Sequence, residues 1–134
     1  MTEVIFFQVK DTQTKLQAIC NLAQSCLENK EPLLILVQDK ASLEFINNLL
    51  WRYPEESFLP HGLEREGQCI ILAEESAAPE MPPVILNLCR EARTNLEGIK
   101  KIYELEDLTS LEKEEAAKKR YKAYRELALP ISYG

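Results

Sequence analysis

A short apolar run, Leu33–Val37 (LLILV), is the feature that most constrains what this chain can fold into. Five consecutive apolar residues are typical of a strand that is covered on both faces. The run lies between two segments, residues 14–28 and 40–53, whose apolar side chains recur with helical spacing. A strand between amphipathic helices predicts a parallel sheet with helices packed against it.

The rest of the chain extends the same pattern. Further strands are expected at residues 3–10, 69–73, 84–88 and 100–105, and a last helix at residues 111–128. The alternating residues of the 100–105 strand predict a position at an edge of the sheet. Ser110 is a suitable N-cap for the last helix, Pro130 closes it, and residues 54–68 and 74–83 are predicted connections. The sequence predicts one Rossmann-like α/β domain over its 134 residues, with a mostly parallel sheet flanked by helices.

The charge balance excludes one broad class of function. Sixteen Lys and Arg face 22 Asp and Glu, a formal net charge of −6. Because phosphate contacts need a basic surface, this balance argues against a general nucleic-acid binder. No apolar stretch approaches the roughly 18 residues of a membrane-spanning helix, and residues 1–10 lack a signal-peptide pattern. We therefore expect a cytoplasmic protein without a membrane partner.

The cysteines and glycines give little support to a metal or cofactor site. The cysteines form no C-x-x-C pair and His61 is the only histidine, so no zinc site is expected. Buried, reduced thiols are expected at Cys20, Cys26, Cys69 and Cys89. Nucleotide-binding folds of this type need glycines where the first strand enters its helix, and residues 9–14 contain none. We expect no glycine loop for a nucleotide and no cofactor.

A catalytic role would depend on His61, which lies between Pro60 and Gly62 in a predicted loop. It could bond a backbone carbonyl, contact a partner or act as a base. The acids around it have no spacing specific for acid–base chemistry. A cysteine nucleophile would have to lie near His61 in space, and thiol labelling of the folded protein would reveal it. No catalytic residue is predicted.

One segment that stands out is residues 50–61 (LWRYPEESFLPH). Trp51, the only tryptophan, flanks the apolar stripe of its helix, and Phe58 lies in a loop among polar residues. Large apolar residues on a loop either pack back into the domain or face a partner. The sequence leaves both alternatives open.

The other segment that stands out is in the last helix. Five positive charges fall within eight residues, with no acid among them: Lys118, Lys119, Arg120, Lys122 and Arg125. Lys118, Lys122 and Arg125 share one helix face, with Tyr121 and Tyr124 one step round. One interpretation is that the tyrosines pack on the sheet and the bases face solvent. The alternatives are a site for an acidic, partly apolar peptide, and a single-strand DNA site that stacks bases on the tyrosines.

Together these segments resemble the chi subunit of bacterial DNA polymerase III holoenzyme. That family carries a Leu-Trp-x-x-Pro-x-x-Ser-Phe-x-Pro-His segment and a C-terminal Arg-Tyr-Lys-x-Tyr-Arg segment, and both occur here in that order, at residues 50–61 and 120–125. The resemblance implies a Rossmann-like, non-catalytic adaptor of the clamp loader. It also implies binding to the acidic C-terminal tail of single-stranded DNA-binding protein, which ends in Pro-Phe, and no direct contact with DNA.

The resemblance assigns residues to two surfaces. The tail would dock on the last helix, at Lys118, Arg120, Tyr121, Lys122 and Arg125. The psi subunit of the clamp loader, or a helicase-like partner, would use Trp51, Phe58, Pro60 and His61. Where a further basic contact is expected upstream in the last helix, this chain has Glu114 and Glu115.

The basic cluster changes how the net charge is interpreted. Removing its five bases from the total of 16 leaves 11 bases against 22 acids, a charge of −11 for the rest of the chain. The sequence therefore predicts an acidic body that repels polyanions, with one basic helix face for a short acidic tail.

Overall fold

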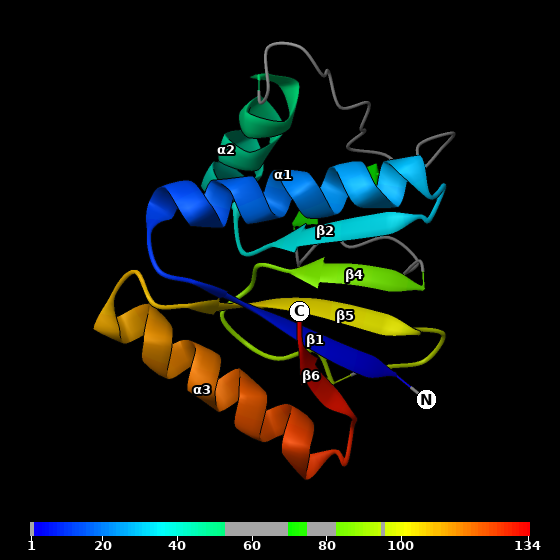
Figure 1. The fold of residues 1–134 in the computed structure, drawn as a ribbon, viewed down its shortest axis with the longest axis vertical. Helices are drawn as coiled ribbons and strands as arrows, with labels where there is room; N and C mark the ends of the chain where they lie inside the picture. Colours follow the sequence, from blue (N-terminus) through cyan, green and yellow to red (C-terminus); the bar gives the residue numbers. More distant parts are fainter. Residues whose placement is uncertain (1, 53–69, 75–82, 95) are drawn as a thin grey trace.

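The computed structural model describes residues 2–52, 70–74, 83–94 and 96–134 (Figure 1). Its strands are β1 (Glu3–Val9), β2 (Leu33–Val37), β3 (Ile70–Glu74), β4 (Val84–Asn87), β5 (Lys101–Asp107) and β6 (Ile131–Tyr133). Its helices are α1 (Thr12–Glu28), α2 (Lys40–Arg52) and α3 (Leu111–Glu126). All elements except β6 were expected, with ends that differ by no more than two residues. The predicted connection at 54–68, and all but the ends of the one at 74–83, lie outside the described residues.

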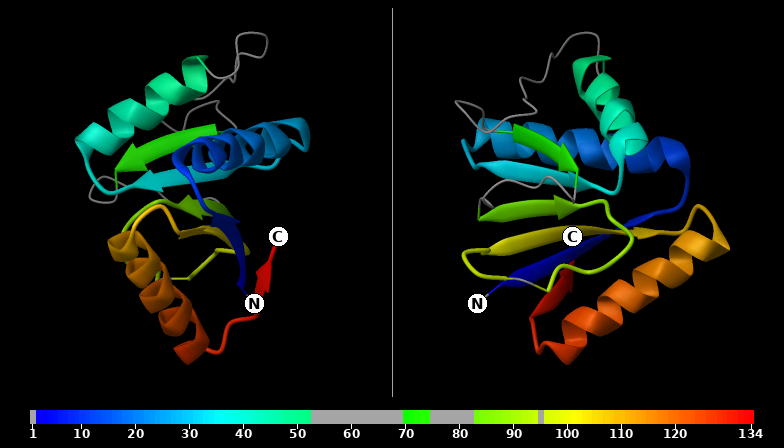
Figure 2. Two further views of the ribbon diagram at one scale, coloured as in Figure 1. Left: turned by 60° about the vertical axis from the view of Figure 1, so that its left-hand side comes forward. Right: turned by 180° about the vertical axis from the view of Figure 1, so that it is seen from behind.

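The described strands form one sheet in the order β3-β2-β4-β5-β1-β6, and every adjacent pair is parallel. Helices α1 and α2 cover one face and α3 covers the other, as the turned views of Figure 2 show. All five residues of β2 are buried, because both faces of this strand are covered. The predicted α/β class and parallel sheet are confirmed.

The position predicted for the fifth strand was wrong. Strand β5 is internal, paired with β4 on one side and with β1 over seven residues on the other. Its alternation does not mark a solvent-facing edge, because Glu104, one of its polar residues, is fully buried under α3. Glu104 instead supplies a hydrogen-bonding group to the interior of the protein.

The strand β6 was not anticipated, because the chain reverses after α3 without a glycine. Ala128 adopts φ +58° just past the helix end. Its N–H donates to the Arg125 carbonyl, and the Leu129 N–H donates to the Tyr124 carbonyl. These two bonds form a Schellman turn, which usually has glycine at this position. The turn directs residues 131–133 to pair with β1 at the edge of the sheet.

The helices begin where the sequence provides capping side chains. The Asp11 carboxylate accepts from the Thr14 N–H at the start of α1, and Ser110 accepts from the Lys113 N–H at the start of α3. Each side chain satisfies an N–H that the helix itself leaves free. None of the described helices is long and apolar enough to cross a membrane.

The left-handed residue after α3 gives a test of this turn. A residue with a Cβ in this conformation costs about 1–2 kcal/mol relative to glycine, part of which is offset by the greater freedom of glycine in the unfolded chain. We expect Ala128→Gly to raise the free energy of unfolding by about 0.5–1 kcal/mol, measured by urea denaturation. Ala123→Gly, the same change inside α3, should lower it by about 1 kcal/mol. Loss of stability in Ala128→Gly would contradict the turn.

Candidate functional site

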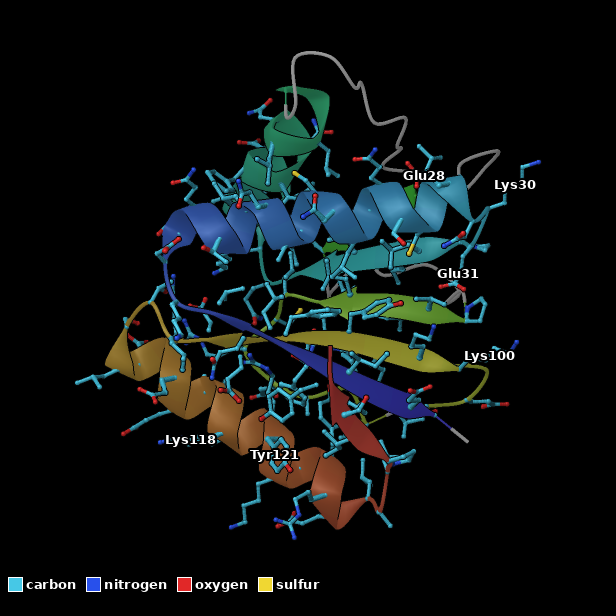
Figure 3. The ribbon with its side chains drawn as sticks, viewed as in Figure 1. Glu28, Lys30, Glu31, Lys100, Lys118 and Tyr121 are labelled. Atoms are coloured by element: carbon cyan, nitrogen blue, oxygen red, sulfur yellow. The ribbon has the colours of Figure 1, made fainter. Side chains whose placement is uncertain are left out.

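The basic cluster of the last helix forms a patch on the outer side of α3. Lys118, Lys119, Lys122 and Arg125 are exposed, and Lys118 extends from the outer side of the helix (Figure 3). The Lys118 ammonium lies 3.9 Å from the carboxylate of Glu114, one turn earlier. At this distance, and with both groups partly in solvent, the pair is weak. The patch therefore keeps most of its positive charge available to a partner.

A half-buried tyrosine lies among these bases. An open hollow of about 380 Å³ is lined by Tyr121, Lys122, Arg125 and Glu126. The Tyr121 ring packs against Phe6 of β1, with 5.6 Å between ring centroids. One side of the ring is thus fixed by the core, and the other borders the hollow. The hollow combines an aromatic surface with positive charge, which suits a ligand that is both anionic and apolar.

Two residues of the Arg-Tyr-Lys-x-Tyr-Arg segment face inward. Tyr124 is fully buried in the core between α3 and the sheet. Arg120 is only 7% exposed, because it lies three residues after the buried Ala117 and four before Tyr124 on one helix face. The three bases predicted to share one face, Lys118, Lys122 and Arg125, are exposed, whereas Arg120, which the resemblance assigned to the tail, faces the sheet.

The guanidinium of Arg120 is bonded to the sheet. Its Nε lies 2.9 Å from Oε1 of Glu104, and the other two nitrogens donate to the carbonyls of Leu105 (3.0 Å) and Arg90 (3.3 Å). Three donors with defined acceptors compensate for the burial of the charge. Arg120 therefore anchors α3 to β5 and to the segment that follows β4.

The Glu104 carboxylate is the centre of a wider buried network. Its Oε2 accepts from the Tyr124 hydroxyl at 2.6 Å and from the Asn87 amide at 2.7 Å. Burial raises the pKa of Glu104, while Arg120 and the hydrogen bonds oppose that rise. Burial and the neighbouring Glu104 raise the pKa of Tyr124, which therefore stays protonated and donates its hydrogen.

The sequence analysis missed one aromatic residue beside the patch. Tyr133 of β6 has its ring centroid 6.5 Å from that of Tyr121, and it is 56% exposed. The alternation of Ile131, Ser132 and Tyr133 after Pro130 was an available signal for a strand, but it is only three residues long.

The second predicted surface falls largely outside the described residues. Trp51 lies in the last turn of α2, whereas Phe58, Pro60 and His61 are outside the described part of the chain.

A crevice of about 600 Å³ opens at the carboxyl ends of β2 and β4, where Rossmann-like folds often bind nucleotides. Two of its charged lining groups already have partners within the chain. Asp39 caps α2 there, and a hydrogen bond from the Ser42 N–H lowers the pKa of its carboxyl, so a negative charge occupies the helix N-terminus. Lys15, another lining residue, is paired with Asp107 at 2.6 Å.

The described cysteines are structural. Cys20, Cys26 and Cys89 are buried, whereas Cys69 lies outside the described residues. Burial raises the pKa of the Cys20 thiol to about 11. A thiol with so high a pKa is a poor nucleophile at neutral pH. Among the described residues, no three His, Cys, Asp or Glu side chains gather in a way that could hold a metal ion.

Comparison with known proteins identifies the family. The family model described as DNA polymerase III chi subunit, HolC, matches residues 1–132. A relative from Pseudomonas aeruginosa, DNA polymerase III subunit chi, is 26% identical over 140 residues, which cover 98% of this chain and 94% of the relative. The chain belongs to the DNA polymerase III chi subunit family. It is thus placed among the non-catalytic accessory subunits of the polymerase that replicates DNA.

The structure sorts the C-terminal motif of this chi-family chain into two groups. Tyr121, Lys122 and Arg125 line the surface hollow, whereas Arg120 and Tyr124 hold α3 against the sheet through Glu104. A single helical motif therefore carries both the surface that a partner can reach and the contacts that keep it in place.

The buried pair gives a test of this division. Arg120→Ala leaves the Glu104 carboxylate buried without its cation, so we expect the free energy of unfolding to fall by about 3–5 kcal/mol. Replacing both partners with apolar residues, Arg120→Met with Glu104→Leu, should recover only part of that loss, because Tyr124 and Asn87 then lack the acceptor that they share. Lys118→Ala, in the exposed group, should change stability by less than about 0.5 kcal/mol. Urea denaturation measures all three, and equal losses in Arg120→Ala and Lys118→Ala would contradict the assignment.

Proposed function

We propose that this chi-family chain is an adaptor that links the clamp loader of DNA polymerase III to single-stranded DNA-binding protein. It binds the acidic C-terminal tail of that protein on the outer face of α3. Lys118, Tyr121, Lys122 and Arg125 contact the tail, and Arg120 keeps the helix in position. The adaptor acts in the cytoplasm, where the replication complex works.

One observation carries this proposal: the hollow between Tyr121, Lys122 and Arg125 joins an aromatic wall to two exposed cations. A tail that carries several acids and ends in an aromatic residue with a free carboxylate has the complementary chemistry. Arg125 can bind a carboxylate through two parallel hydrogen bonds, and the tyrosine can cover the apolar side chain. The acidic remainder of the molecule repels longer polyanions and so favours a short tail.

The competing function is direct binding of single-stranded DNA. It requires aromatic rings on which successive bases stack, beside bases that contact phosphates. Of the two tyrosines expected to stack, Tyr124 is fully buried. One of the five positive charges, that of Arg120, is also paired inside the protein. Both observations favour the peptide over the nucleic acid, and fluorescence anisotropy with an oligonucleotide alone separates the two.

The second proposed surface links the chain to the rest of its complex. Trp51, Phe58, Pro60 and His61 match the family motif that the resemblance associates with the psi subunit or a helicase-like partner. Trp51 lies in the last turn of α2, and α2 and α3 cover opposite faces of the sheet. The proposed adaptor therefore has one site for each partner.

Tail binding is tested by titrating a fluorescent acidic peptide that ends in Pro-Phe. We expect micromolar-class binding to wild type, and binding weakened about two- to fivefold in Arg125→Ala, because an exposed ion pair is lost. Added salt should weaken wild-type binding, since exposed charges are screened beyond ~8 Å at physiological ionic strength.

Two matched controls accompany this titration. Lys40→Ala removes an exposed cation at the start of α2, on the other side of the sheet, and Phe58→Ala alters the second proposed surface. Both should bind the tail as wild type does. Equal affinity in wild type and Arg125→Ala would refute the assignment of the tail to α3.

A further inference from the structure

We propose that Tyr133 forms a second aromatic wall of the tail site and selects a tail that ends in an aromatic residue. This inference rests on the proposed function and adds a residue from β6, an element that neither family motif includes. The site is then built from both α3 and the edge of the sheet.

Three aromatic rings from three different elements lie close together beside α3. Tyr133 is paired in register with Phe6 of β1, and their ring centroids are 6.0 Å apart. The Tyr121 ring lies 5.6 Å from Phe6 and 6.5 Å from Tyr133, with 32° between the planes of the two tyrosines. Distances of this size are those of interacting aromatic pairs. Phe6 is the buried floor of the group, and the two tyrosines are its accessible sides.

The Tyr133 side chain is held in place although it is exposed. Its hydroxyl donates to Oε2 of Glu106 at 2.7 Å, and the Gln8 amide donates to Oε1 of the same carboxylate at 2.9 Å. The bond to Glu106 raises the pKa of Tyr133 to about 12, so the hydroxyl remains a donor at neutral pH. An exposed ring that is already oriented loses little conformational entropy when a ligand packs on it.

The backbone after Tyr133 is fixed as well. The Gly134 N–H donates to the Phe6 carbonyl at 3.0 Å. A Cβ at Gly134 would meet the Phe7 ring on the other face of the sheet. Tyr133 is in register with Phe6, whose side chain lies on the α3 side of the sheet.

Tyr121 connects the aromatic rings with the positive charges of α3. Tyr121 belongs both to the aromatic group and to the hollow with Lys122 and Arg125. A C-terminal aromatic residue presents a ring and a carboxylate on one Cα. Its ring can pack beside Tyr121 and Tyr133 while its carboxylate reaches the cations of α3. An aliphatic side chain would fill the same space but lose the ring–ring contact.

The test is a titration of two acidic peptides that differ at their last residue, one ending in Pro-Phe and one in Pro-Leu. Against Tyr133→Ala, we expect the Phe peptide to bind about three- to tenfold more weakly than to wild type. The Leu peptide should change by less than about twofold, and its retained binding shows that the variant is folded. Tyr133→Phe keeps the ring and should bind both peptides nearly as wild type does.

A matched control is Phe45→Ala, which removes a ring of similar exposure, 54%, from α2 on the opposite face. It should leave the binding of both peptides unchanged. Equal affinity of Tyr133→Ala and wild type for the Phe peptide overturns the inference while leaving the proposed function intact. Equal weakening of both peptides also overturns it, because the ring would then not discriminate. If wild type binds neither peptide, the proposed function fails and the inference fails with it.

Discussion

The fold depends on how one buried carboxylate is satisfied. Glu104 is fully buried in the middle of the sheet, and it is bonded by Arg120 and Tyr124 from α3 and by Asn87 from β4. Leaving such a group without partners would cost several kcal/mol. The network therefore fixes where α3 lies on the sheet. Because the proposed tail site is the outer face of that helix, its position depends on a buried interaction on the inner face.

The motif of α3 has two functions on two faces. Its inward residues bond to Glu104, and its outward residues give the positive patch around Tyr121. This division reduces the available charge, since one of the five bases neutralises an internal acid. The remaining exposed cations lie on the same helix as Tyr121, whose ring contacts Phe6 of β1 and Tyr133 of β6. Such a surface favours a short acidic peptide with an apolar end over an extended polyanion.

Most of the fold could be predicted from local patterns, because its helices are amphipathic and Leu33–Val37 is continuously apolar. The internal position of β5 could not be predicted in this way, because its polar residue Glu104 belongs to a buried hydrogen-bond network. Strand β6 follows Ala128 in a conformation that normally signals glycine. At the site, helical spacing grouped Lys118, Lys122 and Arg125 on one face, but it could not show whether Arg120 faces a partner or the interior. That distinction depends on the partner residue in β5, which is distant in sequence.

The most direct test of the central claim is a pull-down of this chain with full-length and tail-deleted single-stranded DNA-binding protein. The tail site on α3 predicts capture by the full-length protein, loss of capture when the tail is deleted, and strong reduction in a variant with both Lys122→Ala and Arg125→Ala. Equal capture by the full-length and tail-deleted proteins would contradict the account, because the basic face of α3 would then not bind the acidic tail.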